Sequence, residues 1–140
     1  MHLSTEKPNN NFSKNLNLET YCSGMGAIGL PGDLSSTSRF IKATFTKMNS
    51  ISGDSESESI SQFFHILGSV EQQRGCVHIR EDKYETTIYS SCCNMDKGIY
   101  YYKTYENSQI TGINMYKENL DGSILISYNL IKNQQVLMQN

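Results

Sequence analysis

Few side chains of this 140-residue chain could carry out chemistry, and they are scattered along it. The cysteines and histidines are Cys22, Cys76, Cys92, Cys93, His2, His65 and His78. Nucleophilic catalysis needs a thiol, hydroxyl or amine beside a base, with donors placed for the developing oxyanion. No recognisable Cys-His arrangement, paired carboxylates or metal-ligand spacing appears. The residues alone therefore indicate no active site and no metal site.

The cysteines are predicted to be free thiols. None belongs to a C-x-x-C pair, and the neighbours Cys92 and Cys93 would point to opposite faces of a strand. A disulfide between adjacent residues is strained, and the other spacings do not match a secreted disulfide framework. We therefore expect the protein to be located in a reducing compartment, where thiols stay unpaired.

A glycine-rich stretch, residues 24–29, matches the dinucleotide-binding pattern G-x-G-x-x-G. That motif works only where the glycines end a strand and open a helix whose N-terminus faces the pyrophosphate. Pro31 and Gly32 follow at once, so the helix cannot begin at the last glycine. We therefore expect no nucleotide and no other cofactor, and we interpret the glycines as allowing close backbone approach or unusual φ angles.

Arg39 is the remaining candidate for a functional side chain. It lies in the first turns of a helix expected to run to about Met48, with Asp33, Ser35 and Ser36 as possible N-caps. The helix dipole disfavours a cation there by roughly a few tenths of a kcal/mol, so a helix built only for stability would carry a carboxylate instead. An arginine on a helix is more often a solvated side chain with a packed stem, and that interpretation stays open.

The surrounding pattern predicts an α+β fold. A second helix begins at a capping box formed by Ser55 and Glu58, carries an apolar stripe at helical spacing, and is expected to stop at Gly75. The period then changes to two, which predicts strands over residues 77–80, 84–93, 99–105, 109–117 and 123–128. The last strand follows the hairpin signal Asp121-Gly122. These elements form two helices packed on one face of an antiparallel meander of four or five strands.

The strand side chains suggest that the second face of this sheet is also covered, and the chain has no further element to cover it. Tyr100, Tyr101 and Tyr102 are interpreted as rings on a half-buried sheet rather than as a platform for bases. We expect residues 1–140 to be a single partial domain. Its parts are a polar loop (1–20), a glycine-rich turn with two helices (21–75), antiparallel strands (76–130) and a tail (131–140).

The composition excludes several classes of protein. The net charge of −2 provides no basic field for nucleic acid or acidic lipid. The mean hydropathy is −0.49, and no run approaches the ~20 apolar residues of a membrane span. The polar first residues do not match a signal peptide. The sequence therefore predicts a cytoplasmic protein that binds neither nucleic acid nor membranes.

Three long segments resemble the choloylglycine hydrolase family. They are GMGAIGLPGDLSSTSRFIKATFTKMNS, SESESISQFFHILGSVE and YETTIYSSCCNMDKGIYYYKTYENSQI. Within that family they are most similar to bile salt hydrolases, with penicillin V acylases as near relatives. The resemblance extends over about residues 21–128 and corresponds only to the C-terminal part of such an enzyme.

The resemblance implies a fold and a chemistry. Family members are N-terminal nucleophile hydrolases with a four-layer αββα sandwich, of which this chain would supply one helical layer and much of one sheet. Their nucleophile is a cysteine exposed at the mature N-terminus, which cleaves the amide between a bile acid and glycine or taurine. The active centre also contains an arginine of an S-S-x-S-R-F segment, which is Arg39 in this chain. Its implied role is to hold and polarise the nucleophilic centre.

The resemblance also implies what this chain lacks. Residue 2 is His2 rather than a cysteine, and the oxyanion asparagines belong to the N-terminal part. We therefore expect a bile salt hydrolase fragment that is inactive without the missing N-terminal half. The alternatives are a fragment of a penicillin V acylase-type amidase and a non-catalytic assembly module. The loop before Gly24 is expected to help the intact enzyme form a homo-oligomer, a tetramer in the family.

Overall fold

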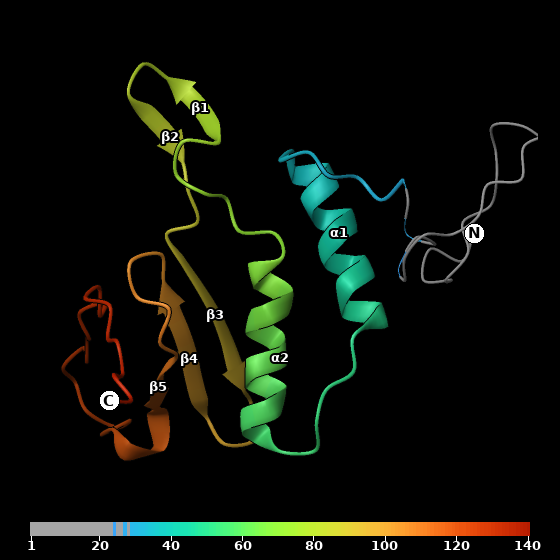
Figure 1. The fold of residues 1–140 in the computed structure, drawn as a ribbon. Coiled ribbons are helices and arrows are strands. Elements are labelled where there is room, and N and C mark those ends of the chain that lie inside the picture. The colour runs from blue at the N-terminus through green and yellow to red at the C-terminus, as the bar shows by residue number, and fades with distance from the viewer. Residues whose placement is uncertain (1–23, 25–26, 28) are drawn as a thin grey trace, which may run out of the picture. The chain divides into compact units, whose positions relative to one another are not determined.

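The structure is a computed structural model that describes Gly24, Ala27 and residues 29–140 (Figure 1). The predicted polar loop (1–20), His2, Cys22 and the remaining positions of the glycine motif lie outside the described residues. The chain divides into two compact units, Met1–Ile51 and Ser52–Asn140, which are considered one at a time.

The described part of the first unit consists of a turn and one helix. Helix α1 spans Ser36–Asn49, one residue longer than predicted, and Ser35 is its N-cap. The chain approaches it through Gly24 and Gly29, whose φ angles of 85° and 99° are those that glycine adopts most readily. The expectation of unusual φ angles is confirmed for these two glycines.

The second unit begins with α2, which spans Glu56–Gly68. The predicted capping box is present, because Ser55 accepts from the backbone of Glu58 while the Glu58 carboxylate accepts from the backbone of Ser55. The prediction that this helix continues to Gly75 is wrong. The chain leaves the helix after Gly68 because Gln72 pairs with Thr87, 15 residues further on, at 2.9 Å and 3.1 Å.

Five strands follow, all antiparallel, in two sheets (Figure 1). The two-stranded sheet contains β1 (Val77–Arg80) and β2 (Lys83–Glu85). The three-stranded sheet has the order β3-β4-β5, with β3 at Tyr89–Asn94, β4 at Ile99–Thr104 and β5 at Thr111–Asn114. A 3-10 turn, Met115–Lys117, ends this part of the chain.

The single predicted strand over residues 84–93 is wrong, because β2 and β3 are separate. Thr87 lies between them and bonds to Gln72 through both its backbone N–H and its hydroxyl. At Thr87 the loop after α2, rather than a neighbouring strand, provides the hydrogen-bond partner. The predicted continuous meander is therefore divided into two sheets.

The predicted strand over residues 123–128 is also wrong. A turn does form at the Asp121-Gly122 signal, where the Gly122 N–H donates to the Asn119 carbonyl at 3.2 Å. The residues after it are exposed and no described strand pairs with them. A strand needs a ladder partner for its backbone groups, so local turn chemistry alone does not produce one.

Helix α2 packs on β3 of the three-stranded sheet. Phe64 of the helix is 5% exposed, and the Lys103 ammonium lies 6.0 Å from its ring centroid. Tyr102 of β4 is 4% exposed, whereas Tyr100 is 38% exposed. Burial of the tyrosines along β4 is therefore uneven, and their interpretation as rings on a half-buried sheet stays a prediction. Cys92 is half-buried and Cys93 is exposed, and both are free thiols as predicted.

Candidate functional site

Arg39 lies in the first full turn of α1, where its backbone N–H donates to the Ser35 carbonyl at 2.9 Å. Its side chain is half-buried. The helix has no acidic residue in its first turn, so the cation stands near the positive end of the helix dipole without a carboxylate from the helix itself. The position is the one that the sequence predicts.

Asp33, two residues before the N-cap, organises this turn. Its Oδ1 accepts from the Ser35 backbone N–H at 2.9 Å, and its Oδ2 accepts from the Ser38 hydroxyl at 2.5 Å. Ser38 is only 7% exposed, and its backbone N–H donates to Ser35 Oγ at 3.3 Å. One carboxylate and one cap hydroxyl therefore fix the residue that immediately precedes Arg39.

These hydrogen bonds hold the pKa of Asp33 at about 2, below its ordinary value of 3.8. The bonds from Ser35 contribute most and the Ser38 hydroxyl adds to them, because both stabilise the ionised carboxylate. Asp33 is therefore charged at neutral pH. It supplies the negative charge that the first turn of α1 lacks.

In the second unit, Glu56 is the residue around which polar groups converge. As the first residue of α2 it accepts from Asn94 Nδ2 at 2.5 Å, Lys97 Nζ at 2.5 Å and Tyr101 Oη at 3.1 Å. The bond from Lys97 is the main cause that lowers the pKa of Glu56, and Glu56 in turn raises the pKa of Lys97. These contacts join α2 to the β3–β4 hairpin.

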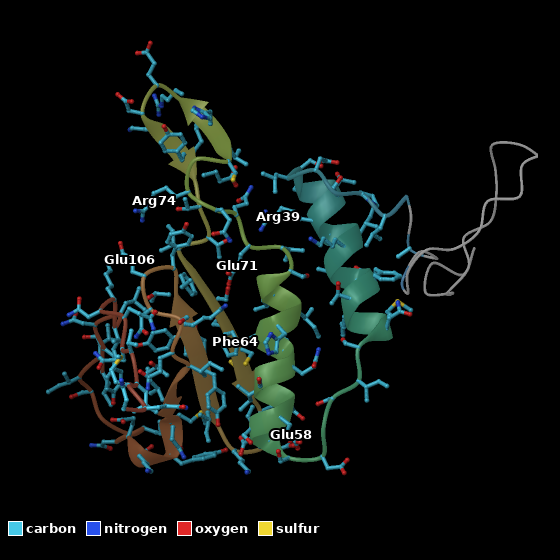
Figure 2. All side chains as sticks on the ribbon, in the orientation of Figure 1. Arg39, Glu58, Phe64, Glu71, Arg74 and Glu106 are labelled. Atoms are coloured by element: carbon cyan, nitrogen blue, oxygen red, sulfur yellow. The ribbon has the colours of Figure 1, made fainter. Side chains whose placement is uncertain are left out.

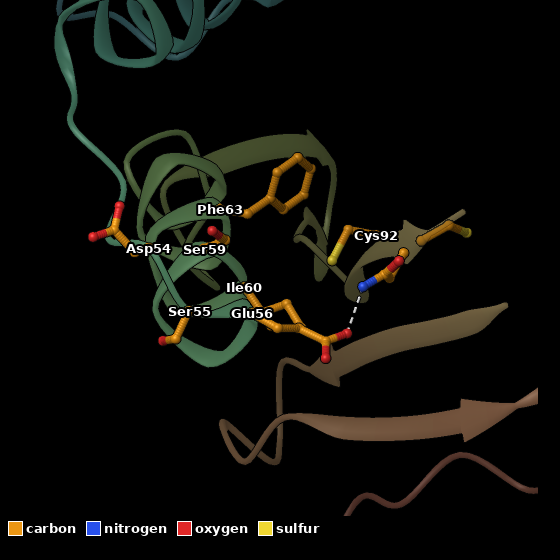
Figure 3. A pocket seen from close by; sticks show the side chains of 9 residues that line it. Asp54, Ser55, Glu56, Ser59, Ile60, Phe63 and Cys92 are labelled. Atoms are coloured by element: carbon orange, nitrogen blue, oxygen red, sulfur yellow. Dashed lines mark hydrogen bonds between the residues drawn. The ribbon is translucent and has the colours of Figure 1, made fainter. Parts of the chain in front are cut away.

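A cleft of about 370 Å³ lies beside Glu56 between α2 and β3 (Figure 3). Ile60, Phe63 and Cys92 provide its apolar lining. Burial raises the pKa of the Cys92 thiol, so this sulfur is protonated at neutral pH and is a poor nucleophile. Cys92 is therefore a structural thiol of the cleft rather than an activated one.

Glu71, which is labelled in Figure 2, belongs to a second polar cluster that joins the loop after α2 to the sheet. Glu71 pairs with Lys103 at 2.8 Å, with side chains 22% and 18% exposed, and accepts from the Ser90 hydroxyl at 3.4 Å. Each ion has its counter-ion, and the pair crosses from loop to strand. Removing either partner would leave the other charge largely buried without its counter-ion.

The described residues contain no group of three or more metal-ligating side chains. Among the same residues, no helix combines the length and the apolar character needed to cross a membrane. Sequence reasoning identified Arg39 but missed the role of Asp33 as an acceptor for Ser38. The available signal was the D-x-S-x-x-S spacing, which placed Asp33 among the possible caps only.

Comparison with known proteins identifies the family. The family described as linear amide C-N hydrolases, choloylglycine hydrolase family, matches residues 1–128. A bile salt hydrolase/transferase of Lactiplantibacillus plantarum is 57% identical over 138 residues, which are 99% of this chain and 43% of that relative. A bile salt hydrolase/transferase of Clostridium perfringens is 48% identical over 105 residues, 75% of this chain and 32% of the relative. The family match thus includes residues 1–20, whereas the resemblance described from the sequence extended only over about residues 21–128.

Solved structures agree with the sequence matches. Two variants of the conjugated bile acid hydrolase of Clostridium perfringens give TM-scores of 0.80 and 0.83 at 42% and 39% identity. They cover 91% and 98% of this chain, which corresponds to 39% and 42% of theirs. A penicillin V acylase of Agrobacterium tumefaciens, with a TM-score of 0.56 at 20% identity, shows a likeness of fold alone. The predicted α+β class, as part of an N-terminal nucleophile hydrolase sandwich, is confirmed.

The chain thus spans about two fifths of the length of the Lactiplantibacillus plantarum relative and of the Clostridium perfringens structures. The described helices α1 and α2 and the antiparallel strands lie within that span. It belongs to the choloylglycine hydrolase family.

Proposed function

We propose that this chain is the C-terminal, arginine-bearing part of a bile salt hydrolase, which cleaves the amide between a bile acid and glycine or taurine. One observation carries the proposal: the 57% identity over 138 residues to a relative that is named a bile salt hydrolase/transferase. The penicillin V acylase alternative has only a likeness of fold in its support.

In this proposal Arg39 is the catalytic contribution of the chain. A guanidinium remains charged at every working pH and offers a planar fork of donors, which suits an oxyanion or a carboxylate. The half-buried side chain and the hydrogen-bonded first turn of α1 support a fixed direction for that fork. Arg39 would hold and polarise a cysteine that another part of the enzyme supplies.

The partner in this proposal is the N-terminal half of the enzyme, because the chain matches only 43% of its relative. The described cysteines are free thiols, and burial raises the pKa of Cys92, which disfavours its thiolate form. We therefore expect the chain to be inactive alone. Assembly of the complete enzyme into a homo-oligomer, a tetramer in the family, and a cytoplasmic location stay predictions, which sedimentation and cell fractionation would test.

The test compares the purified chain with a fusion enzyme. In the fusion, this chain follows the N-terminal part of the Lactiplantibacillus plantarum relative. We expect the chain alone to release no glycine or taurine from conjugated bile salts and the fusion enzyme to release both. A folded fusion that hydrolyses penicillin V but not bile salts would favour the acylase alternative. A folded fusion without any amidase activity would favour the assembly module.

Arg39→Ala in the fusion enzyme should lower kcat/KM by about 100- to 1,000-fold, the usual cost of removing a donor that stabilises transition-state charge. Thr37→Ala is the matched control, since Thr37 is exposed on the same turn and should leave kcat/KM within about twofold. If the two variants had equal activity, Arg39 would be a surface residue with a packed stem.

A further inference from the structure

The residues before α1 show an arrangement that a helix cap alone does not require. The N-cap Ser35 already satisfies the Ser38 backbone N–H, so the helix start has its usual hydrogen bond. Asp33 adds two more bonds from outside the helix, one to the Ser35 backbone and one to the Ser38 hydroxyl. The second of these orients a side chain rather than a helix end.

Ser38 is the point on which this network converges. It is 7% exposed, and it is held twice, by Ser35 Oγ at its backbone N–H and by Asp33 Oδ2 at its hydroxyl. Its neighbour Arg39 is held by the Ser35 carbonyl. The direction of the Arg39 side chain depends on the backbone of Ser38 and Arg39. Hydrogen bonds within this single turn link that backbone to the carboxylate of Asp33.

We propose that Asp33 is a positioning residue for Arg39, acting through the hydroxyl of Ser38 and the backbone of Ser35. This inference rests on the proposed catalytic role of Arg39 and adds a residue to it. Removing the carboxylate leaves the nearly buried Ser38 hydroxyl without its acceptor, and that hydroxyl then turns to a backbone carbonyl of the preceding turn. The first turn of α1 shifts, and the guanidinium fork moves away from its working position.

A double-mutant cycle in the fusion enzyme tests the proposal. Displacement of a reacting group by about 1 Å can cost on the order of 100-fold, so Asp33→Ala should lower kcat/KM by about 10- to 100-fold. In an Arg39→Ala background the same change should cost less than about twofold, because nothing remains to be positioned. Equal losses in both backgrounds would assign Asp33 a purely structural role and overturn the proposal.

Conservative variants separate charge from geometry. Asp33→Asn retains an acceptor for the Ser35 N–H, and its amide can donate to the Ser38 oxygen and so keep that oxygen in place, although the direction of the bond is reversed. It should therefore recover activity to within about threefold of the parent. Ser38→Ala should lose activity as Asp33→Ala does, and Thr37→Ala should not. An Asp33→Asn variant as poor as Asp33→Ala, or a fully active Ser38→Ala variant, would contradict the hydroxyl path.

A measurement on the chain itself covers the case of an inactive fusion. Amide hydrogen exchange should become at least about tenfold faster at Ser38 and Arg39 in Asp33→Ala, and remain unchanged at Phe64 of the second unit. Unchanged exchange at Ser38 would overturn the proposal without any assay. The two proposals fail differently: a fully active Arg39→Ala variant removes the catalytic role, whereas an additive cycle removes only the role of Asp33.

Discussion

The first turns of α1 and α2 solve the same problem in different ways. Both helices begin at a serine cap, but α2 carries Glu56 and Glu58 inside its first turn, whereas α1 carries none there. In α1 the carboxylate lies outside the helix, at Asp33, and the turn itself presents Arg39. One turn is arranged for stability and the other leaves a cation at the unfavourable end of a helix.

The further contacts of α2 extend this difference. Glu56 bonds to three side chains of the β3–β4 hairpin, and Phe64 is buried against the same sheet. Both serve to hold the second unit together. If Asp33 positions Arg39 as proposed, the contacts around a serine cap stabilise the helix in α2 and direct a side chain in α1.

The largest stability effect should come from the buried side of α2. Phe64→Ala should lower the free energy of unfolding of the second unit by about 3–5 kcal/mol, since it removes a buried ring and leaves a cavity. Its neighbour Phe63, which is 40% exposed, is the matched control. Phe63→Ala should lower the free energy of unfolding much less than Phe64→Ala does. Denaturant unfolding followed by circular dichroism would measure both. Equal losses would place the core elsewhere.

The two N-caps provide a sharper comparison. Ser35→Ala and Ser55→Ala should each lower the free energy of unfolding by about 1 kcal/mol, because each removes an acceptor for a backbone N–H at N3. In the fusion enzyme, however, only Ser35→Ala should reduce kcat/KM beyond what its stability explains. An equal loss of activity in Ser55→Ala would remove the distinction between the two turns.

The smallest expected effect is the change in stability at low pH. Asp33 and Glu56 both have a lowered pKa in the folded chain, so each contributes stability above its ordinary value of 3.8 or 4.5. That contribution is lost as the pH falls through the folded value, which for Asp33 is about 2. Titration of the carboxyl carbons by NMR should show Asp33 still ionised at pH 3. A midpoint near 3.8 would mean that its serine bonds are absent in solution.

The local signals in the sequence predicted the helices well. The capping box at Ser55 and Glu58 and the serine cap of α1 act within four residues, so spacing alone reveals them. The end of α2 and the break between β2 and β3 depend on the pairing of Gln72 with Thr87, across 15 residues. No local propensity encodes such a contact, and both predictions failed there.

The site could be predicted only in part for a related reason. Arg39 was identified through the segment that resembles a family, because nothing in its own helical pattern separates it from a surface arginine. The bond from Ser38 to Asp33 depends on the path of the backbone between them. The link from Glu56 to Lys97 spans 41 residues and depends on the packing of α2 on the sheet.

The adjacent thiols of β3 have a practical consequence. Cys93 is exposed, while Cys92 is half-buried beside α2 and has a raised pKa. A maleimide should therefore modify Cys93 before Cys92, and the rate of modification at Cys92 should report how tightly α2 packs on β3. Anything that covers the outer face of the sheet would slow only Cys93. The modification rates of Cys92 and Cys93 can thus be compared within one molecule in chemical footprinting, because their side chains lie on opposite sides of the same strand.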